Sequence, residues 1–153
     1  MSSNPRPGGL TALAVFNFIF GCLSVIGAFG SLVLPRTLEM VANQPGISET
    51  QRQQMQALAD IGPTTLYLLA GGSLISAILL IASGVGYLKL KKFLGRTLGN
   101  ASALFGLAAA LASALWLAPQ LGGGFNIASI INFIYPFVTL ILLNTTFKED
   151  FVN

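Results

Sequence analysis

Residues 10–34 read LTALAVFNFIFGCLSVIGAFGSLVL, an uninterrupted apolar stretch without a charged residue. A helix rises 1.5 Å per residue, so about 20 residues cross a hydrocarbon core of about 30 Å. The stretch is therefore long enough to span a membrane. It is also longer than the apolar region of an ordinary signal peptide, about 7–15 residues. We expect it to stay in the protein as the first of several membrane-spanning helices.

Three more uncharged apolar segments follow, at about residues 64–88, 98–117 and 125–147. The hydrocarbon core offers no water to satisfy backbone N–H and C=O groups, and none of the segments alternates as a barrel strand does. The sequence therefore predicts an all-α membrane protein, a single domain over residues 1–153 that forms an antiparallel bundle of four transmembrane helices. Only 8% of the residues are charged, against about a quarter in soluble proteins.

The long connection between the first two spans predicts one extra helix. Ser48 and Gln51 have the spacing of a capping box, and Ile47 stands where a hydrophobic staple residue would be. We expect a short amphipathic helix over about residues 49–60, with Met55, Leu58 and Ala59 on its apolar stripe. Such a stripe packs on the mouth of its own bundle or lies in the membrane interface. Docking of a partner is the alternative.

The positive charges predict the orientation. Six of the eight lie on one side of the four-span model, and only Arg36 and Arg52 lie on the other; the six are Arg6, Lys89, Lys91, Lys92, Arg96 and Lys148. Cytoplasmic loops carry the excess of Lys and Arg, so we expect cytoplasmic termini and an extracytoplasmic short helix. Without a basic face interleaved with aromatic residues, a nucleic-acid partner is not expected.

Small and polar residues recur at alternating spacings of three and four in the spans. Rows of this kind stay on one helix face, where small residues let membrane helices approach closely. We expect these seams to bring helices together and to leave little room for a wide pore or ligand cavity. Gly95 and Gly99, which match a dimerisation motif, we interpret as a turn that enters the third span. The predicted seam residues are Asn17, Gly21, Ser24, Gly72, Ser76, Ser83, Gly99, Ala103, Gly106 and Ala110.

The fourth span contains the candidate polar or kink site. Pro136 lacks the N–H that would bond to the carbonyl of Asn132, so it predicts a kink near Asn132 and Tyr135. Nearer the span ends, aromatic side chains are expected in the interfacial belt; these are Tyr67, Tyr87 and Trp116.

Residues that carry chemistry are scarce in this chain. It has no His, a single Cys and no ionisable carboxylate within a predicted span. With these residues we expect neither a metal site nor a catalytic triad, and the sequence contains no phosphate-binding loop motif. We therefore expect no enzyme activity, no metal and no cofactor. An intramembrane charge, the usual relay of coupled transport, is also missing from the spans.

Boundary residues at three places resemble small four-helix bacterial membrane proteins of uncharacterised function. The stretches are RPGGLTALA at 6–14, ASGVGYLKLK at 82–91 with LGRTL at 94–98, and LLN at 142–144 with FKE at 147–149. The resemblance covers nearly the whole chain. It implies four spans and a bacterial inner-membrane location, and supplies no catalytic residues.

Two functions fit these patterns. The first is a non-catalytic scaffold or accessory subunit that packs, within the lipid bilayer, against itself as a homo-oligomer or against larger membrane-protein subunits through bulky faces such as Phe16 and Phe20. The alternative is a small solute or ion channel or transporter formed between protomers. The scaffold is favoured because the predicted spans lack embedded charges and the seams are narrow.

The charge distribution gives a direct test of the topology. Membrane-impermeant labels placed at Arg96, or near either terminus, should react only from the cytoplasmic side. A label near Gln53 should react only from outside. Reaction of the Arg96 and Gln53 positions from the same side would contradict the four-span topology.

Overall fold

The computed structural model of the chain describes residues 7–42, 46, 48–117 and 127–151. These residues are nearly all helical and include no β-strand, which confirms the all-α prediction. Two short π-helical segments, η1 and η2, adjoin the ends of α4. The elements in chain order are α1 (Gly8–Ala42), α2 (Glu49–Asp60), α3 (Pro63–Lys89), η1 (Lys92–Thr97), α4 (Leu98–Ala112), η2 (Ser113–Leu117) and α6 (Ile127–Asn144).

Three helical segments are long and apolar enough to cross a membrane. They are Gly8–Leu38, Pro63–Lys89 and Lys92–Trp116; a fourth apolar segment, Ile130–Asn144, is shorter. A lone soluble domain could not cover so much apolar helix surface, because the large hydrophobic side chains point outward along all of these helices. Length and composition therefore support a membrane protein.

The first helix is longer than the sequence predicts. We expected the span to end at Leu34, before Pro35, but Pro35 lies inside α1, which continues to Ala42. A proline in a helix removes one backbone hydrogen bond, here the one to the Ser31 carbonyl, and membrane helices tolerate such an interruption. The long connection to α2 is correspondingly shorter.

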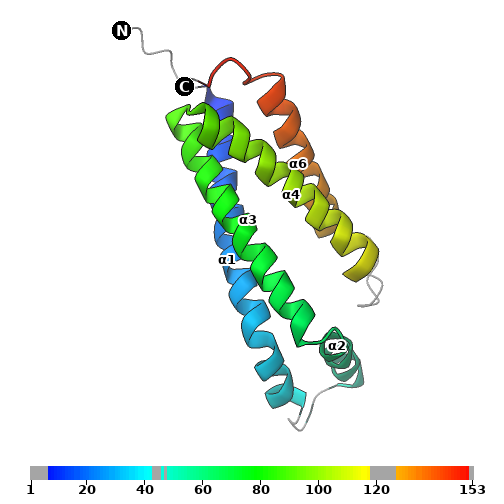
Figure 1. Cartoon of the computed structure of the whole chain (residues 1–153). Coiled ribbons are helices and arrows are strands. Elements are labelled where there is room, and N and C mark those ends of the chain that lie inside the picture. Colours follow the sequence, from blue (N-terminus) through cyan, green and yellow to red (C-terminus); the bar gives the residue numbers. More distant parts are fainter. Residues whose placement is uncertain (1–6, 43–45, 47, 118–126, 152–153) are drawn as a thin grey trace.

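The long helices are arranged as two pairs. α3 packs along most of α1, and α4 packs along α6; the second pair diverges from the first along its length (Figure 1). In the first pair, Gly21 of α1 lies against Ala77 and Ile81 of α3. In the second pair, Gly106 of α4 lies against Pro136 of α6. The architecture is thus a wedge rather than a uniformly closed bundle.

The two pairs meet at the end of the molecule where α1 begins and α6 ends (Figure 1). A cluster of buried side chains fills this end, which we call the apex; it consists of Leu10, Leu13, Ala14, Tyr87, Leu143, Phe147 and Phe151. At the same end Asn100 of α4 and Asn144 of α6 exchange side-chain hydrogen bonds at 2.9 and 3.3 Å. The apex is therefore the packed core of the fold.

A close backbone crossing between α3 and η1 lies beside this core. A Cβ atom at Gly86 would overlap the backbone of Leu94 and Gly95, and one at Gly95 would overlap the Phe151 ring. The tight connection also places Leu90 at a φ of 53°, in the left-handed region. Gly95 and Gly99, interpreted from sequence as a turn, are packing residues, since Gly99 in its turn lies against Tyr87 and Leu143.

The short helix has the bounds that the sequence predicts. α2 spans Glu49–Asp60 and begins with the capping box: the Gln51 backbone N–H donates to the Ser48 hydroxyl oxygen, and the Ser48 N–H donates to the Gln51 side chain. α2 lies at the far end of the α1–α3 pair from the apex (Figure 1). The proposed staple residue Ile47, Arg6 and the connection with Pro119 and Gly122–Gly124 lie outside the described residues.

The glycine crossing gives a stability prediction. Gly86→Ala should lower the melting temperature in detergent sharply, because the new methyl group meets backbone atoms that cannot move aside; overpacking of this kind costs about 1–3 kcal/mol or more. Gly71→Ala in the same helix is the matched control, since no described atom lies within 4 Å of a Cβ there. It should leave stability unchanged or raise it slightly. Equal losses in both variants would contradict the crossing.

Candidate functional site

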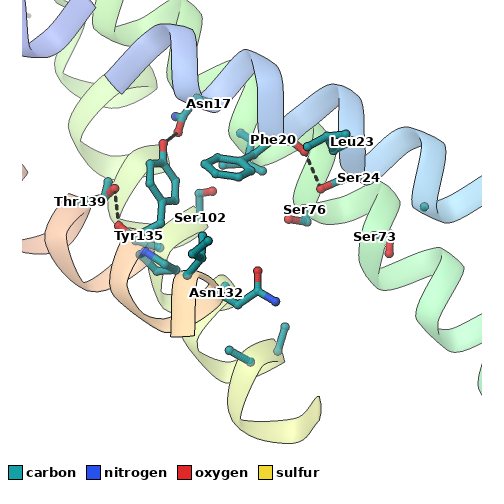
Figure 2. A pocket seen from close by; sticks show the side chains of 18 of the residues that line it. Asn17, Phe20, Leu23, Ser24, Ser73, Ser76, Ser102, Asn132, Tyr135 and Thr139 are labelled. Atoms are coloured by element: carbon teal, nitrogen blue, oxygen red, sulfur yellow. Dashed lines mark hydrogen bonds between the residues drawn. The ribbon is translucent and has the colours of Figure 1, made fainter. Parts of the chain in front are cut away.

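A groove of about 530 Å³ lies between the two helix pairs. All four long helices contribute to its walls, and small side chains dominate on α4. Hydroxyl groups of serine are spaced along the α1 and α3 side, where Ser24, Ser73 and Ser76 lie (Figure 2). The groove is thus mostly apolar, with hydrogen-bonding groups at intervals. The small residues of the wall formed by α4 and the start of η2 are Gly99, Ser102, Ala103, Gly106, Ala109, Ala110 and Ser113.

The groove overturns the expectation that the seams leave no roomy cavity. Ser24 and Ser76 were predicted to close helix against helix, but they line the space between the pairs; Ala103 and Ala110 also border this space, although both are buried as predicted for packing residues. Small side chains permit close approach only where the facing helices run close together. Because the pairs meet at the apex and then diverge, the same small residues leave a space beyond it.

A buried polar network lies at the apex end of the groove. Asn17, 1% exposed, donates from Nδ2 to the Ser83 hydroxyl at 2.7 Å. The Tyr135 hydroxyl donates to Asn17 Oδ1, so that the α6 side chain reaches across to α1 (Figure 2). Ser83 in turn donates to the Leu80 carbonyl at 3.0 Å. These bonds tie α1, α3 and α6 together at one point.

Aromatic packing reinforces this point. The Tyr135 ring lies 4.7 Å from the Phe20 ring and 6.2 Å from the Phe16 ring, measured between centroids. Phe16 and Phe20 were expected to face lipid or another protein. Instead Phe20 lines the groove beside Tyr135, and Phe16, half exposed, also packs toward it. These two residues are therefore less suited to bind an outside partner than the sequence suggested.

Tyr87 is the groove residue that sequence reasoning missed. It was assigned to the interfacial belt, yet it is 0% exposed and lines the groove. Its hydroxyl has no hydrogen-bond partner among the described residues. An unpaired buried hydroxyl costs about 1–3 kcal/mol, so such a group is unusual. The sequence does contain a signal for this position. Tyr87 follows the predicted seam residue Ser83 by four positions, so both residues lie on the same face of the helix.

The remaining predicted site residues lie in several places. Asn132 and Pro136 both line the groove; Asn132 is exposed, and Pro136 is buried against Gly106. The Thr139 hydroxyl donates to the Tyr135 carbonyl at 2.8 Å. Gly72 differs from expectation, because no described atom lies within 4 Å of a Cβ built there.

The described lining of the groove consists of apolar and neutral polar residues. No Asp, Glu, Lys or Arg stands among the described residues that line it. The described residues also contain no group of three metal-ligating side chains. Such a surface can make apolar contacts and neutral hydrogen bonds. In comparisons with known proteins, no family model, curated protein or solved structure matches the chain.

The network gives a second stability prediction. Asn17→Leu should destabilise the protein by about 1–2 kcal/mol, because it leaves the Ser83 and Tyr135 side chains without their shared partner. Ser24→Ala is the control on the same helix, since among the described residues the Ser24 hydroxyl bonds only to the Phe20 carbonyl of its own helix. It should change stability by less than about 0.5 kcal/mol. Detergent melting measures both, and equal effects would mean that Asn17 does not tie the helices together.

Proposed function

We propose that all four long helices cross the inner membrane of a bacterium in alternating directions, with both termini in the cytoplasm. In support, α6 has 18 residues, which gives about 27 Å of helix against a core of about 30 Å. The clustering of Lys and Arg around the α3–η1 connection supports the orientation. The bacterial location rests on the resemblance of the boundary residues.

The proposed activity is non-catalytic: the protein is an accessory subunit that holds a neutral, largely apolar molecule in the groove between its helix pairs. The groove itself carries this proposal. Its volume of about 530 Å³ is within the range of small-molecule sites, about 300–1,000 Å³. At membrane depth it opens to lipid rather than to water, so its occupant must be soluble in the bilayer.

The outer surface supports association with other chains, which is the scaffold part of the proposal. Large apolar side chains such as Ile26 and Phe29 of α1, 67% and 60% exposed, face away from the helix pairs. These faces fit lipid tails and neighbouring membrane helices equally well. The protein would thus bring a bound apolar molecule to a larger membrane assembly, or hold it between copies of itself.

A solute or ion pathway is the second candidate. The observation that favours it is the row of hydrogen-bonding groups in the groove, Asn132 among them. However, the groove ends at the apex, where Leu10, Leu143 and Phe147 are at most 7% exposed. A groove that ends at a packed core suits the binding of a molecule better than the passage of a solute or ion across the membrane.

A groove-filling substitution tests the binding function. Ser76→Phe places a ring in the groove, whereas Ile75→Phe, at the neighbouring exposed position, does not. Binding of pyrene, a fluorescent hydrocarbon, to the detergent-solubilised protein should weaken about five- to a hundredfold in Ser76→Phe and little in Ile75→Phe. Equal binding by both variants would contradict an occupied groove.

The same protein in vesicles tests the second candidate. We expect no selective leakage of ions or small solutes from vesicles that contain the wild-type protein. Selective flux that disappears in Asn132→Leu while assembly stays intact would establish the pathway and overturn the binding function.

A further inference from the structure

We propose that the apex of the groove is a hydrogen-bonding site for the carbonyl oxygen of a neutral apolar molecule, with the Tyr87 hydroxyl as the donor. This inference rests on the proposed binding function and names the chemistry of the molecule bound. The observation that carries it is a fully buried hydroxyl that lines the groove and has no partner among the described residues.

The protein holds the Tyr87 hydroxyl in a fixed position. The ring is packed on one side by Phe151, with centroids 6.2 Å apart. Its outer end reaches α4, where a Cβ atom on Gly99 would overlap the hydroxyl oxygen. Gly99 also lines the groove, so the hydroxyl stands at the groove's apex end. The absence of a side chain at Gly99 is what lets the hydroxyl fit against the α4 backbone at the wall of the groove.

The polar groups nearby already bond to one another. Asn17 donates to Ser83 and accepts from Tyr135, and Ser83 donates to the Leu80 carbonyl. The Tyr87 hydroxyl is outside this set of bonds. Each of these neighbours has a bonded partner, whereas the Tyr87 hydroxyl has none among the described residues, so this hydroxyl is available to donate to an acceptor from outside the chain.

The surroundings determine the kind of acceptor. A phenolic hydroxyl is a better donor than acceptor, because its oxygen lone pair is delocalised into the ring. A carboxylate or phosphate would need a cation to compensate for its burial. No Lys or Arg is among the described residues that line the groove. A neutral carbonyl, as in a fatty acyl ester or a lipid-soluble quinone, meets both conditions, with its tail along the small residues of α4.

The experiment compares three probes that carry the same decyl tail: decylbenzene, methyl undecanoate and decyl-benzoquinone. The first has no carbonyl, the second an ester carbonyl and the third a quinone carbonyl. The change in melting temperature of the whole protein in mild detergent is measured against probe concentration. Tyr87→Phe removes only the hydroxyl. Tyr67→Phe is the matched control, because Tyr67 lies on the same helix, is 56% exposed and does not line the groove.

We expect at least one carbonyl probe to bind the wild-type protein more tightly than decylbenzene. Tyr87→Phe should weaken that probe about two- to tenfold, the usual worth of one neutral hydrogen bond, and leave decylbenzene unchanged. Without any probe, Tyr87→Phe should melt at the same temperature as wild type or higher, because it removes an unpaired buried hydroxyl. The ester and quinone arms identify which carbonyl the site prefers.

Three results would overturn the inference. The first is equal binding of the carbonyl probes and decylbenzene by the wild type. The second is equal weakening in Tyr87→Phe and Tyr67→Phe. The third is a lower melting temperature, or failure to fold, in probe-free Tyr87→Phe, since the hydroxyl would then bond within the protein. If decylbenzene itself fails to bind, and Ser76→Phe has no effect on pyrene, the proposed binding function fails first.

Discussion

The close approach of α3 and η1 is the constraint on which the rest of the structure depends. Gly86 meets the backbone of Leu94 and Gly95, so the chain reverses within a few residues and α4 starts against α3. The apex core forms around this crossing, with Tyr87 and Leu143 fully buried. Two helix pairs joined at one end can diverge at the other, and the wedge follows from that.

The wedge explains how one set of small residues serves two purposes. Near the apex they let backbones approach, as at Gly99 against Tyr87 and Leu143. Farther from it, Ala109 and Ala110 face the groove, and their small size adds to its volume. Membrane helices gain stability from contact and hydrogen bonds rather than from hydrophobic burial, so an open groove must be filled by lipid or by a ligand. The account of function depends on what fills it.

Local features were predictable from the sequence, and the relative placement of helices was not. Three long apolar helices follow from uninterrupted apolar stretches, and the start of α2 follows from the capping-box spacing of Ser48 and Gln51, because each signal lies within one continuous segment of the sequence. Pro35 misled, since a proline interrupts one backbone hydrogen bond without ending a membrane helix. The groove was missed because spacing gives the face of a helix but not its divergence from a neighbour. Tyr87 was placed in the interfacial belt because its position near a span end was given more weight than its four-residue spacing from Ser83, which places it on the buried face.

The most direct test of the wedge is a pair of spin-label distances in reconstituted bilayers, measured by pulsed electron paramagnetic resonance in a Cys22→Ser background. One pair joins Ile75 to Leu104, nearer the apex. The other joins Leu68 to Leu111, farther from the apex, where the two helix pairs diverge. All four positions are exposed, and on each helix the two lie seven residues apart, on the same face. The wedge predicts a longer distance for Leu68–Leu111 than for Ile75–Leu104. Equal distances would mean that the pairs run side by side, and that the groove does not exist in the membrane.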